Sequence, residues 1–338
     1  MPHSKKECTT LLQQIESLSQ DAQNPHEALI VQVSFLIPAL NEEVNIRCCI
    51  EAIRQFSSKS HAYEILVGDH GSTDRTADIA TSLGAKVMEF RGGTIAALRN
   101  FLVSNATGWL IVFVDADVCL TAEWSRAFDA TVAELQRQPL QLTGSRCLPP
   151  PSENLIIKHW FAEMSTDKHV YLGTGHIIFT RSAFDEIGGF DAALRTGEDY
   201  EFCMRARDKG CALNINPDLK VIHHDYPLTI AAFLRREGWH GSGDFQSLSN
   251  ILKSKVALIT LTFVGLHLAA IALLFVDWRL ALGCLSLILL MVAGMSWVKF
   301  PTLKRASRTK NIFIFYCYLT GRSWSLLSRL GSGAWKIR

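Results

Sequence analysis

The chain has 338 residues, a length that allows one large domain and additional segments. Its formal net charge at pH 7 is only +2, which argues against the strongly basic surface of a nucleic-acid-binding protein, so we expect no nucleic-acid partner. The nine cysteines contain no CxxC pair and no zinc-motif spacing, which favours reduced thiols used as small apolar side chains over a disulfide framework.

The first 30 residues are polar and mixed in charge, and they lack the apolar core of a secretory signal. Leu11, Leu12, Ile15 and Leu18 recur at helical spacing, which indicates a short amphipathic helix. We therefore treat residues 1–30 as a segment separate from the domain that follows.

Strand-like and helix-like segments alternate from residue 31 to residue 225, which predicts an α/β fold with a mixed, mostly parallel sheet flanked by helices. A helix ending at Leu83 is expected to be capped by Ser72 or Thr73, with Asp74 in its first turn. The other expected helices are 41–56 and 94–106, and the expected strands are 31–40, 63–67, 86–90 and 109–114.

Polar residues follow three of these strands, in the segments 38–42, 69–72 and 115–117. Ligands of such sheets bind beyond the carboxyl ends of the strands. All three segments should therefore meet at one edge of the sheet and form a site.

Asp115 and Asp117 follow a very apolar strand and are two residues apart, so their carboxylates can face one point. Two converging carboxylates repel each other unless a cation lies between them, and Mg²⁺ or Mn²⁺ bound with a nucleotide diphosphate fits these oxygen ligands. The alternative is that both acids end a strand in a solvated turn.

Two other acidic positions each allow a functional and a purely structural interpretation. Asp69, before Gly71, can accept from a base N–H or a ribose hydroxyl, or can belong to an ordinary capped turn. Glu198 and Asp199 open a helix predicted to reach Lys209, where a carboxylate can deprotonate an acceptor hydroxyl. Acidic residues are also common in any first helical turn.

His223 and His224 end a strand-like segment, and one of them can serve as a third metal ligand or diphosphate contact, although such pairs are often structural. Arg236 could hold a diphosphate and Trp239 could stack on an acceptor ring. The alternative for this segment is anchoring to anionic lipid.

The last third of the chain contains two uncharged stretches, 256–276 and 280–298, which favour a membrane hairpin over two buried helices of a soluble core. Basic residues flank both stretches, so the positive-inside rule places the large domain in the cytoplasm and the turn outside. The basic and aromatic tail, 301–338, suits a helix lying in the membrane interface, with a short third span as the alternative.

The order of these motifs resembles family 2 glycosyltransferases with the GT-A fold, here of a membrane-anchored bacterial type. The motifs that carry the resemblance are PALNEE at 38–43, GDHGSTDRT at 68–76, RGGTIAALRN at 91–100, FVDAD at 113–117, GTGHIIFTRSAFDEIGGFD at 173–191 and GEDYEFCMR at 197–205. The resemblance implies a catalytic domain at residues 31–250, followed by two transmembrane helices within 251–300.

The resemblance also implies a role for each matching residue. Asp115 and Asp117 would bind the metal, and Asp199, with Glu198 beside it, would be the general base of an inverting transfer. Arg99 would lie near the donor phosphates. The nucleoside pocket would be lined by Pro38, Asn41, Glu42 and Asp69.

The sequence departs from the family pattern at two points. His70 stands where the family often has a second acid, so the base contact, and with it the choice between a UDP- and a GDP-sugar, stays open. The QxxRW motif of processive synthases is absent, which favours transfer of one sugar to a lipid-linked or glycan acceptor at the cell membrane. A sugar nucleotidyltransferase and a non-catalytic membrane subunit are the competing interpretations.

Overall fold

The computed structural model describes residues 32–57, 61–164, 171–245 and 247–330. The amphipathic helix predicted in the first 30 residues and the end of the basic tail lie outside these ranges.

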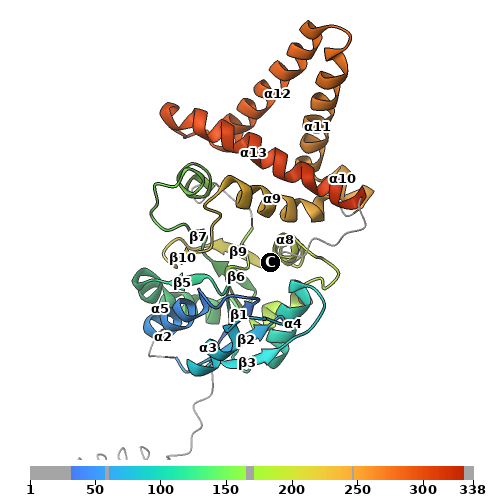
Figure 1. The fold of residues 1–338 in the computed structure, drawn as a ribbon. Coiled ribbons are helices and arrows are strands. Elements are labelled where there is room, and N and C mark those ends of the chain that lie inside the picture. The colour runs from blue at the N-terminus through green and yellow to red at the C-terminus, as the bar shows by residue number, and fades with distance from the viewer. Residues whose placement is uncertain (1–31, 58–60, 165–170, 246, 331–338) are drawn as a thin grey trace, which may run out of the picture.

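A seven-stranded sheet with the order β3-β2-β1-β4-β8-β6-β9 forms the centre of the molecule (Figure 1). Neighbouring strands from β3 to β4 pair in parallel, whereas β8 is antiparallel to both β4 and β6. This arrangement confirms the predicted mixed, mostly parallel sheet. The strands are β1 (Val33–Ala39), β2 (Tyr63–Asp69), β3 (Lys86–Glu89), β4 (Leu110–Val114), β6 (Gln141–Gly144), β8 (His176–Thr180) and β9 (Ala212–Ile215).

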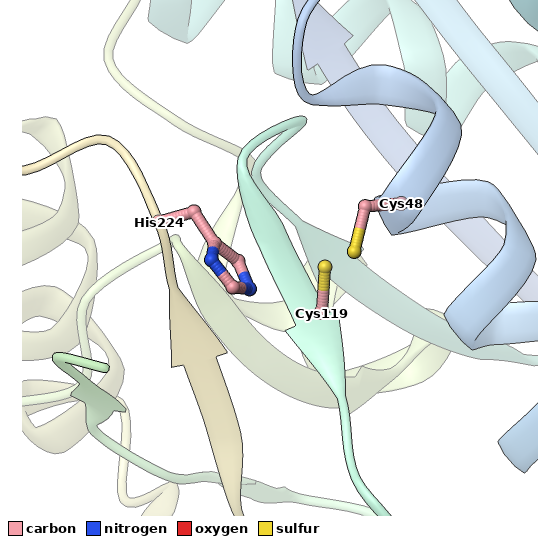
Figure 2. A group of neighbouring side chains, drawn as sticks. All are labelled: Cys48, Cys119 and His224. Carbon is pink, nitrogen blue, oxygen red and sulfur yellow. The ribbon is translucent and has the colours of Figure 1, made fainter. Parts of the chain in front are cut away.

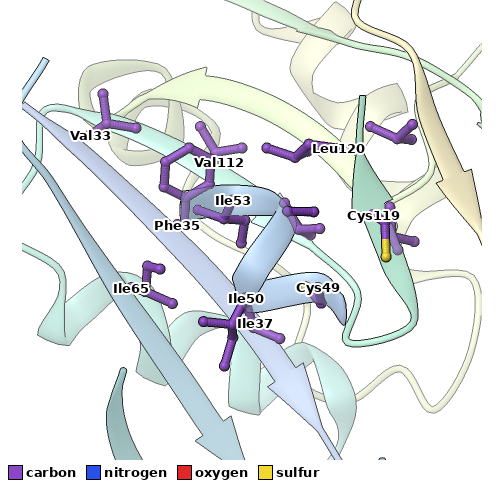
Figure 3. Close-up of a cluster of buried hydrophobic side chains, with 14 of the residues drawn as sticks. Val33, Phe35, Ile37, Cys49, Ile50, Ile53, Ile65, Val112, Cys119 and Leu120 are labelled. Carbon is purple, nitrogen blue, oxygen red and sulfur yellow. The ribbon is translucent and has the colours of Figure 1, made fainter. Parts of the chain in front are cut away.

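Helices cover both faces of the sheet because the strand side chains alternate between two buried clusters. Phe35 and Ile37 of β1 pack with Ile50 of α2, as Figure 3 shows, whereas Leu36 belongs to the cluster on the opposite face. The first face carries α2 (Ile46–Phe56), α3 (Thr76–Ser82) and α5 (Ala122–Arg137). The second carries α4 (Ile95–Asn105), α7 (Arg181–Ile187) and α8 (Glu198–Asp208).

A small second sheet, in the order β5-β10-β7, begins directly after the acidic turn that follows β4. Its strands are β5 (Val118–Leu120), β7 (Cys147–Leu148) and β10 (Val221–His223). In β10, which is antiparallel to β5, His223 is paired with Val118. This pairing brings the end of the predicted histidine segment to the acidic turn.

Two helices begin later than the sequence predicts. The backbone at Asn41 is left-handed, with φ of 57°, so α2 starts only at Ile46. Neither Ser72 nor Thr73 caps α3, which starts at Thr76, where the Asp74 carboxylate accepts from the backbone N–H. The residues between strand and helix form loops because their polar groups bond across to each other, as described below.

The C-terminal part is helical, and its two longest apolar helices, α11 and α12, project beyond the rest of the molecule (Figure 1). Both are long and apolar enough to cross a membrane, and only 22% of each apolar stretch is buried inside the protein. A core helix of a soluble protein would be mostly buried, so these helices suggest a membrane anchor. The helices are α9 (Ile230–Asp244), α10 (Leu248–Lys253), α11 (Lys255–Leu274), α12 (Trp278–Lys299) and α13 (Arg305–Leu330); η1 (Ile157–Phe161) and α6 (Ala162–Met164) precede β8.

Helix α13 packs extensively against α9 rather than lying apart from the sheet-containing half. Gly321 lies so close to α9 that a Cβ added there would approach the Leu234 carbonyl oxygen to 2.8 Å. Beside it, the Arg322 guanidinium bonds to Glu237 at 3.1 Å and to Asp244 at 3.0 Å, and the Glu237 side chain is only 3% exposed. A charged network therefore joins the two helices. Sequence periodicity alone did not predict it.

Replacing Arg322 with methionine is expected to destabilise the α9–α13 contact by about 3–5 kcal/mol, because the buried Glu237 carboxylate loses one of its two cationic partners. The expected result is a lower midpoint of thermal unfolding in detergent. Arg235→Met, an exposed position on α9, is the matched control and should unfold like the wild type. Equal midpoints for Arg322→Met and the control would contradict a stabilising role of this network.

Candidate active site

The loops after β1 and β2 bind each other through their polar side chains. Asn41 donates its backbone N–H to the Ser72 hydroxyl at 2.9 Å, and its side-chain oxygen accepts from the Thr73 N–H at 2.8 Å. The Glu42 N–H donates to the Thr76 hydroxyl at 2.7 Å. The residues predicted to line a nucleoside pocket are thus held together at the carboxyl edge of the sheet, where Pro38 is buried in β1.

Asp69 at the end of β2 is buried, and its carboxylate accepts hydrogen bonds within the turn that follows β2. It accepts from the Ser72 N–H at 3.2 Å and from the Ser72 hydroxyl at 2.5 Å. The structure therefore favours the turn interpretation of Asp69, and contact with a base or ribose stays a prediction. His70 next to it lies 3.3 Å from the Gly92 carbonyl oxygen.

The acidic pair lies in the turn between β4 and β5, where the Val118 N–H donates to the Asp115 carbonyl at 2.9 Å. The Asp117 carboxylate lies 3.1 Å from Nε2 of His223 and is 12% exposed. Burial, the neighbouring Asp115 carboxylate and the charges of Glu42 and Asp225 raise the pKa of Asp117 to about 8. Two carboxylate charges in this largely buried turn would repel each other, as the sequence predicts, and a cation between Asp115 and Asp117 would relieve that repulsion.

The two histidines have different surroundings. His223 contacts the Asp117 carboxylate, and burial lowers the pKa of His223 to about 4, so its imidazole is neutral at physiological pH. Among the described residues, its buried Nδ1 has no hydrogen-bond partner. Carboxylate oxygens and a neutral imidazole nitrogen are suitable ligands for a divalent ion, so this donor set fits Mn²⁺ or Mg²⁺. His224 instead points toward Cys48 and Cys119 (Figure 2).

Arg99 on α4 is buried between two acidic groups instead of facing open space. Its guanidinium lies 2.6 Å from Glu198 and 3.3 Å from Asp115. Arg99 therefore joins Asp115 of the acidic turn to Glu198 at the start of α8. Its predicted place near the donor phosphates stays a prediction.

Asp199 opens helix α8 next to this ion pair, and its side chain takes no part in it. Its Oδ1 accepts from the Tyr200 N–H at 2.8 Å. Burial, the adjacent Glu198 charge and the charge of Asp115 raise the pKa of Asp199 to about 6. A carboxylate with this pKa is ionised at neutral pH and still basic enough to accept a proton, as a general base requires.

Two glycines before β8 leave space beside the acidic residues. The sequence analysis gave neither glycine a role of its own. A Cβ on Gly175 would lie 3.2 Å from Oδ2 of Asp115, and one on Gly173 would lie 3.7 Å from Oδ2 of Asp199. The segment 173–175 therefore passes beside both carboxylates without covering them. The GTG sequence itself was the available signal.

Helix α9 carries Arg236 and Trp239 beyond the second sheet. The Arg236 guanidinium lies 2.8 Å from Glu237 and 4.9 Å from the centre of the Phe161 ring, and its charge contributes to the lowered pKa of His223. It is therefore close to the predicted metal site. Trp239 is 41% exposed, so its indole is available for stacking.

Two family models match this chain in succession: glycosyl transferase family 2 over residues 34–144 and glycosyl transferase family group 2 over residues 152–303. Together they include the acidic pair, Asp199 and both long apolar helices.

Curated proteins that are named as glycosyltransferases match this chain at low sequence identity. The chain is 25% identical over 228 residues to glycosyltransferase AglE of Haloferax volcanii, covering 63% of this chain and 73% of that protein. It is 24% identical over 163 residues to the pre-mycofactocin glycosyltransferase of Mycobacterium tuberculosis, covering 43% of this chain and 33% of that protein. The chain thus spans most of the first relative's length and a third of the second's.

The solved mannosyltransferase PcManGT of Pyrobaculum calidifontis, in complex with GDP-Man and Mn²⁺, has a similar fold. The TM-score is 0.54 at 17% identity, and the match covers 97% of this chain and 95% of that one. With its mixed sheet, its acidic turn after β4 and two successive family matches, the chain is a glycosyltransferase of family 2.

Proposed function

We propose that this chain transfers a single sugar, with inversion, from a UDP- or GDP-sugar to a lipid-linked or glycan acceptor at the cytoplasmic face of a membrane. The observation that carries the proposal is the junction at Arg99. One buried guanidinium binds both Asp115 of the acidic turn and Glu198, the neighbour of Asp199. This junction would hold the groups that a donor and an acceptor need around one reaction space.

The donor would bind along the edge formed by the loops after β1, β2 and β4. Pro38, Asn41, Glu42 and Asp69 would surround the nucleoside, and Arg236 would approach the diphosphate from α9. Asp115, Asp117 and His223 would hold Mg²⁺ or Mn²⁺, which neutralises the negative charge of the leaving diphosphate. The complex of PcManGT with GDP-Man and Mn²⁺ supports this class of donor and metal.

Asp199 would act as the general base. Its carboxylate would accept the proton of the acceptor hydroxyl while that oxygen forms a bond to the anomeric carbon and the bond to the diphosphate breaks. Glu198 cannot easily share this task because it is ion-paired with Arg99 at 2.6 Å. In-line attack with one base leads to inversion.

The membrane assignment rests on α11 and α12 and on the charges around them. Lys253 precedes α11 and Lys255 is its first residue. Lys299 ends α12 and Lys304 follows it, so both outer ends would face the cytoplasm. In this proposal residues 31–250 are catalytic, residues 251–300 cross the inner membrane twice, and residues 301–338 form a basic tail. Trp239 would then contact an acceptor presented from the bilayer.

The test is nucleotide release by purified, detergent-solubilised full-length protein incubated with UDP-, GDP- and dTDP-sugars, in Mn²⁺, in Mg²⁺ and in EDTA. We expect release of one nucleotide that depends on the metal, and a thermal shift with the same nucleotide. Absence of both signals across the panel would overturn the donor site and favour a non-catalytic subunit. Formation of a nucleotide sugar from a nucleoside triphosphate and a sugar phosphate would instead identify a nucleotidyltransferase.

A further inference from the structure

Two thiols and one imidazole meet beside the candidate active site without belonging to it. Ligand atoms of Cys48, Cys119 and His224 all lie within 4.8 Å of one another, and Figure 2 shows the three side chains converging. Their positions, 48, 119 and 224, are far apart in the sequence, so no local spacing motif indicates the cluster.

The fold brings these side chains together for identifiable reasons. Cys119 pairs with Ile222 in the antiparallel β5–β10 ladder, so His224, two residues further on, lies diagonally across from Cys119 on the same face. The His224 N–H donates to the Asp117 carbonyl at 2.9 Å, which extends the ladder and holds the histidine backbone. Helix α2 packs on β5 and contributes Cys48.

We propose that Cys48, Cys119 and His224 form a second metal site, which binds Zn²⁺ and is distinct from the carboxylate site of Asp115 and Asp117. Thiolate sulfur and imidazole nitrogen are preferred ligands of Zn²⁺, whereas Mg²⁺ and Mn²⁺ prefer oxygen, so the two sites select different ions. With Zn–S bonds of about 2.3 Å, two sulfurs of a tetrahedral site lie ~3.8 Å apart, and the ligand atoms here all lie within 4.8 Å of one another.

Binding would form two Zn–S bonds and one Zn–N bond, and each thiol would release its proton to solvent. Cys48 and His224 are exposed and Cys119 is buried, so an ion can enter from the surface and keep water as its fourth ligand. No oxidant is required, and the protein supplies all three non-water ligands.

A metal ion bound at this position would hold together elements that surround the candidate active site. Cys119 is two residues from Asp117, His224 follows His223, and Cys48 lies on the helix that follows the loop of Asn41 and Glu42. An ion held by all three would link α2, β5 and the end of β10. We therefore expect Zn²⁺ to raise the unfolding temperature, whether or not the proposed donor and acceptor are correct.

The experiment is a Co²⁺ titration of full-length, detergent-solubilised protein that has been reduced and desalted, in an excess of Mn²⁺ to occupy the carboxylate site. Wild type should bind one Co²⁺ with thiolate-to-metal charge-transfer absorption in the near ultraviolet, and Zn²⁺ should displace it stoichiometrically. This absorption requires sulfur ligands, so the carboxylate site cannot produce it.

Cys48→Ser removes an exposed ligand and should retain the fold. It should lose about half of the charge-transfer absorption per bound metal and bind Zn²⁺ at least about tenfold more weakly, since even loss of an outer-shell partner costs that much. Cys284→Ser, within α12, is the matched control and should behave like the wild type. Absence of the absorption in reduced wild type, or a band unchanged in Cys48→Ser, would overturn the site.

Discussion

Replacing Asp199 with asparagine is expected to lower kcat by roughly 10²- to 10⁴-fold, because the amide keeps the shape of the side chain and cannot accept a proton. The Kd for the nucleotide sugar should change little, since the Asp199 side chain takes no part in the ion pairs of Arg99 with Asp115 and Glu198. Single-turnover transfer and isothermal titration with the donor identified in the panel measure the two quantities separately.

Asp208→Asn, an exposed acid at the other end of α8, serves as the control and should retain full turnover. The pH profile provides an independent check. Because the folded pKa of Asp199 is raised to about 6, the base becomes protonated below that pH. The wild-type kcat/KM should therefore fall as pH decreases through about 6. Unchanged turnover in Asp199→Asn, or a kcat/KM independent of pH in this range, would exclude Asp199 as the base.

Replacing Asp117 with asparagine is expected to weaken Mn²⁺ binding by at least roughly 10²-fold and to abolish metal-dependent donor binding, because an anionic ligand becomes neutral. The fold should not suffer. With a pKa raised to about 8, Asp117 is largely protonated at pH 7 in the metal-free protein, so a neutral amide replaces a neutral acid. The unfolded chain would ionise Asp117 at this pH, so the variant should unfold at the same or a higher temperature than metal-free wild type.

Titration calorimetry with Mn²⁺ and thermal unfolding with and without the metal distinguish loss of binding from loss of structure. Asp78→Asn, an exposed acid on α3, is the control for a change of net charge. Wild-type Mn²⁺ affinity in Asp117→Asn would show that the ion binds elsewhere. A lower metal-free unfolding temperature would contradict the neutral state assigned to Asp117.

Features that depend on residues close together in the sequence could be predicted. Alternating apolar segments indicated the mixed sheet. The two-residue spacing of Asp115 and Asp117 predicted carboxylates that face one point, and the charge of Asp115 does act on Asp117, although the backbone there forms a turn and not an extended strand. The two apolar stretches near the C-terminus also became α11 and α12, with bounds shifted by a residue or two. In each case the pattern that carries the prediction lies within one strand, turn or helix.

Features that depend on which elements meet could not be predicted in the same way. Arg99 lies 99 positions before Glu198, and only the packing of α4 beside α8 makes them partners. The start of α2 was misplaced because the polar groups of Asn41 and Glu42 bond to the loop after β2, and these tertiary contacts override helical periodicity. The Cys48–Cys119–His224 cluster likewise exists only once β5, β10 and α2 are assembled.

The contact between α9 and α13 would limit how far the sheet-containing half could move relative to the apolar helices. Arg236 lies near the predicted metal site, and its neighbour Glu237 is bound by Arg322 of α13. In the proposed membrane orientation, such a joint would leave no hinge at this position and would hold the proposed reaction space at a constant height above the bilayer surface. A lipid-linked acceptor of the proposed kind would then have to extend its hydroxyl to that height, and the length of the group between its lipid and its sugar would become a criterion for selection.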